Sequence, residues 1–198
     1  MKTKAYILIV LLAVLAVSLP TKAQNLNYHA YNKLLQKHVN SFGEVNYQAI
    51  KTDPQLLQAS LEGFTKTQPN KSWSQEERLA YWINAYNAFT IKLIIDNYPI
   101  NSIKDLKNPW DQEFIPIGKQ LMSLNQIEHD ILRKMKEPRI HFAIVCASKS
   151  CPKLLNEAYT PSKLDLQLTL ATEEFLSDET NNNLSVETIK LSKIFKWF

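Results

Sequence analysis

Glycine is scarce in this 198-residue chain, which has only three, and none of them stands in a nucleotide-binding or hydrolase motif. Gly43, Gly63 and Gly118 are isolated, so the patterns G-x-G-x-x-G, G-x-x-x-x-G-K and G-x-S-x-G are all missing. These patterns form the phosphate loops of dinucleotide-binding and P-loop proteins and the nucleophile elbow of α/β-hydrolases. Their absence argues against these three classes of protein.

Clusters of basic residues are also missing, although the formal net charge of the whole chain is +4. A nucleic-acid-binding surface gathers its lysines and arginines in one patch, whereas the lysines here are scattered along the sequence. Three of the 23 basic residues, Lys2, Lys4 and Lys22, precede a predicted cleavage site, which leaves 20 basic against 19 acidic residues. We therefore predict no nucleic-acid partner.

Only one long apolar run is present, and it lies at the N-terminus. Ala5 to Leu19 follows Lys2 and Lys4, and Ala23 supplies a small residue directly before Gln24, as in a secretory signal peptide. The run is shorter than the roughly 20 apolar residues that a membrane-spanning helix needs. No cysteine for lipid attachment lies near the cut. We expect export to the periplasm or the extracellular space, without a membrane anchor after cleavage.

The chain after the signal peptide of residues 1–23 is expected to form one domain, because residues 24–198 contain no repeat, low-complexity tract or linker. Two capping boxes, Ser74–Glu77 and Asn125–Glu128, mark the starts of two helices. We predict an α+β fold, mostly helical, with a small antiparallel or mixed sheet and one long buried central helix. The expected elements are helices at 27–39, 54–63, 75–97, 125–135 and 160–176, hairpins at 114–123 and 184–191, and a strand at 140–147.

The central helix carries two amides, Asn84 and Asn87, among small and apolar residues. Residues three apart lie on the same face of a helix, so the two side chains are expected to point the same way. They are either core amides that bond neighbouring backbone, or groups that hold a catalytic ring or a substrate carbonyl.

Both cysteines of the chain follow a histidine within eleven residues. In a strand at 140–147, His141 and Cys146 would face opposite sides and could not form a dyad. Cys151 directly precedes Pro152 and is expected to cap a helical turn, where unpaired amides favour a thiolate. Export favours a Cys146–Cys151 disulfide instead. A disulfide, a reactive Cys151 and two inert thiols are open alternatives, whereas a metal site lacks a C-x-x-C or H-x-x-x-H pair.

Three further polar residues could complete a site. His129 and Arg133 lie four apart on the polar side of the helix at 125–135, and they either face solvent or line a cleft. Arg139 could bind a carboxylate through two hydrogen bonds or could form an ordinary surface ion pair.

Five segments stand out when the chain is read as a whole. They are Ala80-Tyr-Trp-Ile-Asn-Ala-Tyr-Asn-Ala88, Ser123-Leu-Asn-Gln-Ile-Glu-His-Asp-Ile-Leu-Arg133, Pro138-Arg-Ile-His-Phe-Ala-Ile-Val-Cys-Ala-Ser-Lys-Ser-Cys-Pro152, Glu157-Ala-Tyr159 and Ile189-Lys-Leu-Ser-Lys-Ile-Phe-Lys-Trp197. In this order they resemble the domain-of-unknown-function family DUF547, over about residues 28–198. The resemblance adds Glu128 and Tyr159 to the positions of interest. It also implies a domain shortened at its C-terminus, because the family pattern normally continues past Trp197 with aromatic and acidic residues.

Two functional hypotheses follow. The first is a thiol-dependent hydrolase or acyl transferase, with Cys151 as nucleophile, His141 or His129 as base and Asn84 as an orienting or oxyanion group. The second is a non-catalytic binding or scaffold domain with a structural Cys146–Cys151 disulfide and an envelope peptide or glycan as its partner. No cofactor is implied by either. The expected binding residues are Asn87, Glu128, Arg133, Arg139, Cys146 and Tyr159.

Overall fold

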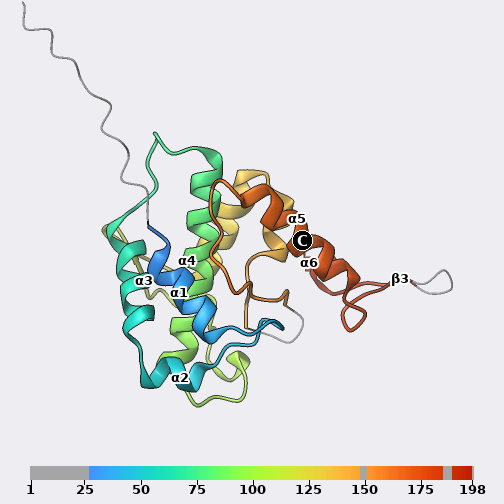
Figure 1. Ribbon diagram of the computed structural model, residues 1–198, viewed down its shortest axis with the longest axis horizontal. Coiled ribbons are helices and arrows are strands. Elements are labelled where there is room, and N and C mark those ends of the chain that lie inside the picture. Colours follow the sequence, from blue (N-terminus) through green and yellow to red (C-terminus); the bar gives the residue numbers. More distant parts are fainter. Residues whose placement is uncertain (1–26, 148–150, 185–188, 198) are drawn as a thin grey trace, which may run out of the picture.

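The computed structural model describes residues 27–147, 151–184 and 189–197, and its elements surround one buried helix (Figure 1). That helix, α4 (Gln75–Asp96), runs through the centre of the molecule, with the N-terminal helices on one side and the C-terminal elements on the other. The predicted signal peptide lies outside the described residues.

The two ends of α4 lie where the sequence predicts them. Ser74 Oγ accepts a hydrogen bond from the Glu77 backbone N–H (3.1 Å), and Glu77 Oε2 accepts one from the Ser74 N–H (2.7 Å). This capping box satisfies two of the N–H groups that a helix start leaves open. Fifteen of the 22 residues of α4 are buried, so the helix is covered on all sides rather than along one stripe.

The N-terminal helices α1 (His29–His38), α2 (Tyr47–Thr52) and α3 (Gln55–Lys66) cover one side of α4. Tyr81 is the centre of this packing. Its ring lies edge-to-face against Phe64 and Trp73, with centroids 5.7 Å away in each case, and its hydroxyl donates to the Phe64 carbonyl (2.6 Å). The sequence pattern did not predict α2, a short helix capped by the side chain of Asn46.

The first predicted hairpin is confirmed. Strands β1 (Ile115–Ile117) and β2 (Gln120–Met122) pair antiparallel, with Ile117 opposite Gln120. Gly118 takes a positive φ of 66° in the turn, a conformation that residues with a Cβ rarely adopt. A short 3₁₀ turn, η1 (Ile103–Asp105), lies between α4 and this hairpin along the chain.

The predicted regular helix at 125–135 is wrong in type. The segment forms a π-helix, η2 (Gln126–Ile131), followed by a 3₁₀-helix, η3 (Leu132–Met135). The expected Asn125–Glu128 capping box is not formed; Ser123 and Gln126 bond each other's backbone N–H groups instead. Ser123–Gln126 also fits the capping-box pattern. The Glu128 side chain, which does not take part in this cap, is buried.

The predicted strand at 140–147 is also wrong. Residues Pro138–Phe142 form a 3₁₀-helix, η4, with proline at its start and the Glu137 carboxylate accepting from the Arg139 N–H (3.0 Å). The backbone of Ala143 and Val145 bonds the side chain of Asn87 rather than a neighbouring strand. This mostly apolar run is thus an irregular segment and not a strand, so the argument that placed His141 and Cys146 on opposite faces of a strand does not apply.

The C-terminal elements are α5 (Leu164–Ser177), the paired strands β3 (Asn183–Leu184) and β4 (Ile189–Lys190), and α6 (Ile194–Trp197). The helix predicted from residue 160 begins four residues later, because the Gln167 side chain binds the Thr160 N–H (3.0 Å) and holds it in the preceding loop. The second predicted hairpin is confirmed, although residues 185–188 lie outside the described residues.

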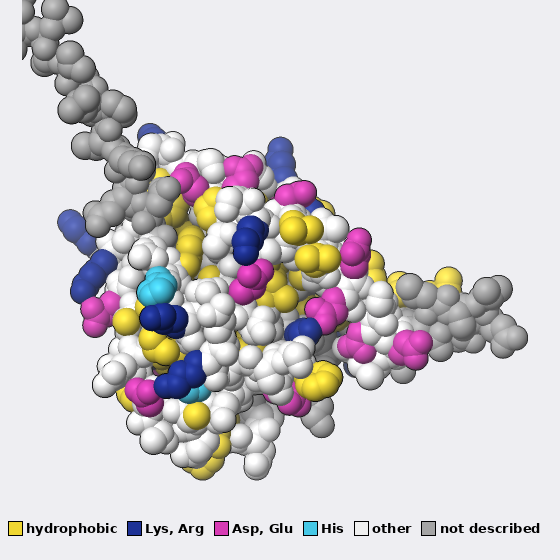
Figure 2. Space-filling view, in the orientation of Figure 1, with side chains coloured by type: hydrophobic (Ala, Val, Ile, Leu, Met, Phe, Trp, Pro, Cys, Tyr) yellow, Lys and Arg dark blue, Asp and Glu magenta, His cyan; other side chains and the backbone are white. Residues whose placement is uncertain are grey.

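The fold is α+β and mostly helical, with small antiparallel hairpins, as predicted. None of the helices among the described residues is long and apolar enough to span a bilayer. Lysine and arginine side chains are interspersed with aspartate and glutamate over the face shown in Figure 2, which agrees with the scattered charges of the sequence.

Candidate functional site

The two amides of α4 both bind backbone. Asn84 is buried; its Nδ2 donates to the Tyr159 carbonyl (2.7 Å), and its Oδ1 accepts from the Tyr159 N–H (3.0 Å). Asn87 is buried too; its Nδ2 donates to the Ala143 carbonyl (2.9 Å), and its Oδ1 accepts from the Val145 N–H (2.8 Å). Each amide thus donates one hydrogen bond to, and accepts one from, the backbone of an irregular segment. This is the first of the two alternatives that the sequence left open, namely core amides that bond neighbouring backbone.

Cys146 and Cys151 form a disulfide, with their Cα atoms 6.1 Å apart. The bridge closes the loop that follows the segment bound by Asn87. Ala147, inside this loop, takes a positive φ of 54°, in the left-handed region. Of the alternatives for the cysteines, the structure shows the disulfide. In this state Cys151 has no thiol that could act as a nucleophile.

A cavity of about 630 Å³ borders the disulfide. Cys151, Asn87 and Thr90 belong to its lining, together with the exposed ring of Phe42. One of the predicted catalytic residues and one of the predicted binding residues therefore lie at the same hollow of the surface.

Glu128 is a buried carboxylate at the side of α4. Its Oε2 lies 3.5 Å from the Tyr86 hydroxyl, and its Oε1 is buried without a hydrogen-bond partner. Burial raises the pKa of Glu128 above its ordinary value, an effect that the charges of His129 and Arg133 and the contact with Tyr86 partly offset. Burial and the Glu128 charge together raise the pKa of Tyr86 well above its usual range. The carboxyl is therefore biased towards its protonated form.

His129 and Arg133 lie at the surface beside Glu128. Both side chains are exposed, which is the first of the two predicted alternatives, and Arg133 Nη1 is 3.1 Å from His129 Nδ1 although the segment is π- and 3₁₀-helical. An arginine can only donate, so in this hydrogen bond His129 Nδ1 is the acceptor. The pair thus presents a guanidinium and an imidazole N–H at one place.

His141 completes this group from η4. Its ring is half-buried, and burial together with the positive charges of Arg133 and His129 lowers its pKa to about 4. The imidazole is therefore neutral at physiological pH. We call Tyr86, Glu128, His129, Arg133 and His141 the acid–histidine cluster.

The chemistry of the acid–histidine cluster follows from these shifts. It combines a carboxyl whose pKa is raised, an imidazole whose pKa is lowered and a permanent positive charge. Titratable groups whose pKa values are perturbed by burial and a nearby charge are one mark of a candidate functional site. Four of the five residues were predicted as site residues; the fifth, Tyr86, was not, although it lies in the segment Ala80–Ala88 on which the family resemblance rests.

Arg139 and Tyr159 do not belong to the cluster. The Arg139 guanidinium bonds the Glu137 carboxylate (2.7 Å), the Asp165 carboxylate (2.9 Å) and the Thr169 hydroxyl (2.8 Å), which ties η4 to α5. The hydrogen bond from Arg139 is the main cause that lowers the pKa of Glu137. Tyr159 is buried, and its backbone is the partner of Asn84. Both residues have structural contacts here, so their predicted binding roles gain no support from geometry.

Within the described ranges, no three histidine, cysteine, aspartate or glutamate side chains gather in a way that could hold a metal ion. Comparison with known proteins gives one match. The family model described as "Protein of unknown function, DUF547" matches residues 70–176. No curated protein and no solved structure matches the chain. The matched range covers more than half of the chain and every residue of the acid–histidine cluster, and the protein therefore belongs to the DUF547 family.

Proposed function

We propose that this protein is an exported binding domain whose acid–histidine cluster holds an anionic group, such as the C-terminal carboxylate of an envelope peptide. The observation that carries the proposal is that the groups needed for thiol catalysis already have other partners in the protein. Cys151 is in a disulfide, and the amide of Asn84 uses both its Oδ1 and its Nδ2 on Tyr159. The predicted signal peptide at residues 1–23 is the reason for proposing export.

The exposed part of the cluster is suited to an anion. Arg133 is exposed, and its guanidinium is a planar fork of N–H donors, one of which bonds His129 Nδ1. A carboxylate matches this fork through two parallel hydrogen bonds. The Nε2–H of His129 supplies a further donor beside it.

The buried part of the cluster favours the same ligand. The raised pKa of Glu128 reduces the negative charge beneath Arg133, and the lowered pKa of His141 keeps that ring neutral. An incoming carboxylate therefore meets the charge of Arg133 without full repulsion from Glu128.

The test uses two peptides that differ only in charge. Titration calorimetry with N-acetyl-dialanine and with its C-terminal amide should show binding of the free carboxylate and binding of the amide that is weaker by roughly tenfold or more. Arg133→Gln should abolish this preference. Lys134→Gln is the matched control, because it removes a neighbouring exposed charge that is paired with Asp130. Equal binding of both peptides, or equal loss in the two variants, would refute the proposal.

A second candidate function has one observation in its favour. Cys151 lines the 630 Å³ cavity, so a thiol released by reduction would face a hollow large enough for a substrate. This is the thiol-dependent hydrolase or acyl transferase. Iodoacetamide labelling of the reduced protein over a range of pH separates the two functions. Rapid labelling at pH 6 that is lost in Cys151→Ser would support the enzyme, because it requires a thiolate of low pKa, whereas slow labelling at pH 6 that rises with pH as for an ordinary thiol would support the binding domain.

A further inference from the structure

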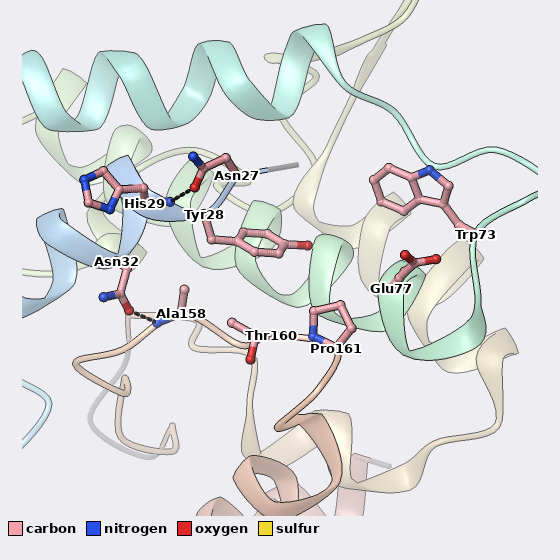
Figure 3. Close-up of a pocket in the computed structure, with 9 residues that line it drawn as sticks. All are labelled: Asn27, Tyr28, His29, Asn32, Trp73, Glu77, Ala158, Thr160 and Pro161. Atoms are coloured by element: carbon pink, nitrogen blue, oxygen red, sulfur yellow. Dashed lines mark hydrogen bonds between the residues drawn. The ribbon is translucent and has the colours of Figure 1, made fainter. Parts of the chain in front are cut away.

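A second cavity, of about 400 Å³, lies away from the acid–histidine cluster and shares no residue with it. It is an open pocket lined by the start of α1, the start of α4 with the preceding Trp73, and the loop Ala158–Pro161 (Figure 3). Its volume lies in the range of roughly 300–1,000 Å³ that is usual for small-molecule sites. Nothing in the sequence patterns pointed to it, because its residues come from three separate segments.

The walls of this cavity are held by the core. The ring of Tyr28 packs on Phe64 with centroids 6.3 Å apart, and the indole of Trp73 lies edge-to-face on Tyr81 at 5.7 Å. Both aromatic walls are therefore fixed before a ligand enters, which lowers the entropic cost of binding.

The cavity has two chemically different ends. Figure 3 shows His29 and Asn32 towards one end and Trp73 and Glu77 towards the other, with the Tyr28 ring between them and its hydroxyl pointing towards the Glu77 end. Among the described residues that line the cavity, Glu77 is the only carboxylate, and no lysine or arginine is present. The end beside Trp73 therefore has a negative potential.

The Glu77 carboxylate is fixed in place by the capping box. Its Oε2 accepts from the Ser74 N–H (2.7 Å), which leaves Oε1 as the oxygen that can meet a ligand. Tyr28 is close enough for the Glu77 charge to act on it. Burial first, and this charge in addition, raise the pKa of Tyr28 far above neutrality, so its hydroxyl stays uncharged. A fixed carboxylate between two aromatic side chains is an arrangement that binds organic cations.

We propose that this cavity binds a ligand with a primary ammonium group on an alkyl chain, of which the lysine side chain of a peptide is the simplest example. The ammonium group lies against Glu77 Oε1 and the neighbouring aromatic walls. The methylene chain lies along the Tyr28 ring and the Pro161 ring, which are apolar surfaces at the centre of the cavity.

The first test compares two ligands on the unchanged protein. In titration calorimetry Nα-acetyl-lysine amide should bind, and the same compound acetylated at Nε should bind roughly tenfold more weakly or not at all, because acetylation removes the positive charge. Equal affinity for the two compounds, or no binding of the charged one at millimolar concentration, would overturn the proposal.

The second test uses a substitution that separates the cap from the charge. Glutamine also completes a capping box at this helix position, so Glu77→Gln keeps the helix start while it removes the carboxylate. We expect an unchanged melting temperature and a loss of affinity for Nα-acetyl-lysine amide of roughly tenfold. Glu76→Gln is the matched control, since Glu76 is exposed in the same turn and does not line the cavity. Unchanged affinity in Glu77→Gln would refute the assignment. Arg133→Gln should leave this binding intact, so the outcome is independent of the proposed carboxylate site.

Discussion

Replacing Asn84 by alanine should be among the most damaging single changes in this protein. The amide makes two hydrogen bonds to Tyr159, at 2.7 and 3.0 Å, and both backbone partners are buried. A buried backbone group left without a partner costs about 1–3 kcal/mol, so the loss of both bonds should lower the free energy of unfolding by roughly 2–6 kcal/mol. For a protein of this size about 1 kcal/mol shifts the melting temperature by roughly 2–4 °C. We expect a fall of roughly 5–20 °C.

The assay is urea unfolding followed by circular dichroism, with Asn97→Ala as the matched control. Asn97 is an exposed asparagine directly after the same helix, and its side chain makes one hydrogen bond, to the Leu93 carbonyl (2.8 Å). Its loss should cost less than about 1 kcal/mol, because Asn97 is exposed and water can take the place of its side chain. Similar effects of Asn84→Ala and Asn97→Ala would refute the reasoning.

Asn84→Asp tests the same bonds through pH. A protonated carboxyl group has a donor and an acceptor, as the amide has, whereas the ionised form has only acceptors and would face the Tyr159 carbonyl. The pKa of this buried carboxyl should therefore be raised above its unfolded value of about 3.9. The variant should approach the wild type in stability below that pH and lose stability as the pH rises towards its folded pKa. A loss that is independent of pH would contradict this account.

The other predictions concern the candidate site and its supports. Because the pKa of Glu128 is raised in the folded state, its ionisation opposes folding as the pH rises above the unfolded pKa. In urea unfolding, the stability of Glu128→Gln minus that of the wild type should therefore be larger at pH 8 than at pH 4. His141 has a folded pKa of about 4 against about 6.5 unfolded, so wild-type stability should fall as the pH drops from 6.5 to 4, and His141→Gln should flatten this part of the pH profile. The loop closed by Cys146 and Cys151 has a sequence separation of only 5, so its reduction should cost about 2 kcal/mol, measured by urea unfolding with and without reductant. A lysine cannot reproduce the hydrogen bonds of the Arg139 guanidinium to Glu137, Asp165 and Thr169. Arg139→Lys should therefore lower the free energy of unfolding by roughly 1–2 kcal/mol and the melting temperature in a thermal scan by a few degrees.

The parts of the fold that the sequence predicted are those with local causes. The capping box at Ser74 and Glu77 is formed by residues three apart, so it is visible in the sequence and present in the structure. The hairpin around Gly118 also has a local cause, because its two-residue turn sets the pairing of the strands on either side.

The failed prediction of a strand at 140–147 has a non-local cause. A strand needs a neighbouring backbone, and a short apolar run shows only that the segment is buried, not which backbone pairs with it. Here the partner is the side chain of Asn87, which lies 56 residues before Ala143 and 58 before Val145. No periodicity in the segment itself reveals that partner.

The candidate site also combines features with local causes and features that depend on tertiary packing. The pairing of His129 with Arg133 was open to prediction, since residues four apart meet on a helical surface. Their meeting with Glu128 against Tyr86, and with His141, depends on how η2 and η4 pack beside α4, which is a tertiary property. The pKa shifts depend on the same packing, because burial is their first cause.

The long reach of the amides on α4 also has a consequence for the order of events during synthesis. Asn84 can form its hydrogen bonds only after Tyr159, which is 75 residues further along the chain, has been synthesised. Until then the nascent chain contains a largely apolar helix whose Asn84 side chain has no backbone partner from that segment. Contacts between distant residues form late and leave incomplete chains prone to aggregation. A chain that ends before Tyr159 therefore cannot complete its core, so this domain can finish folding only after Tyr159 has been translated.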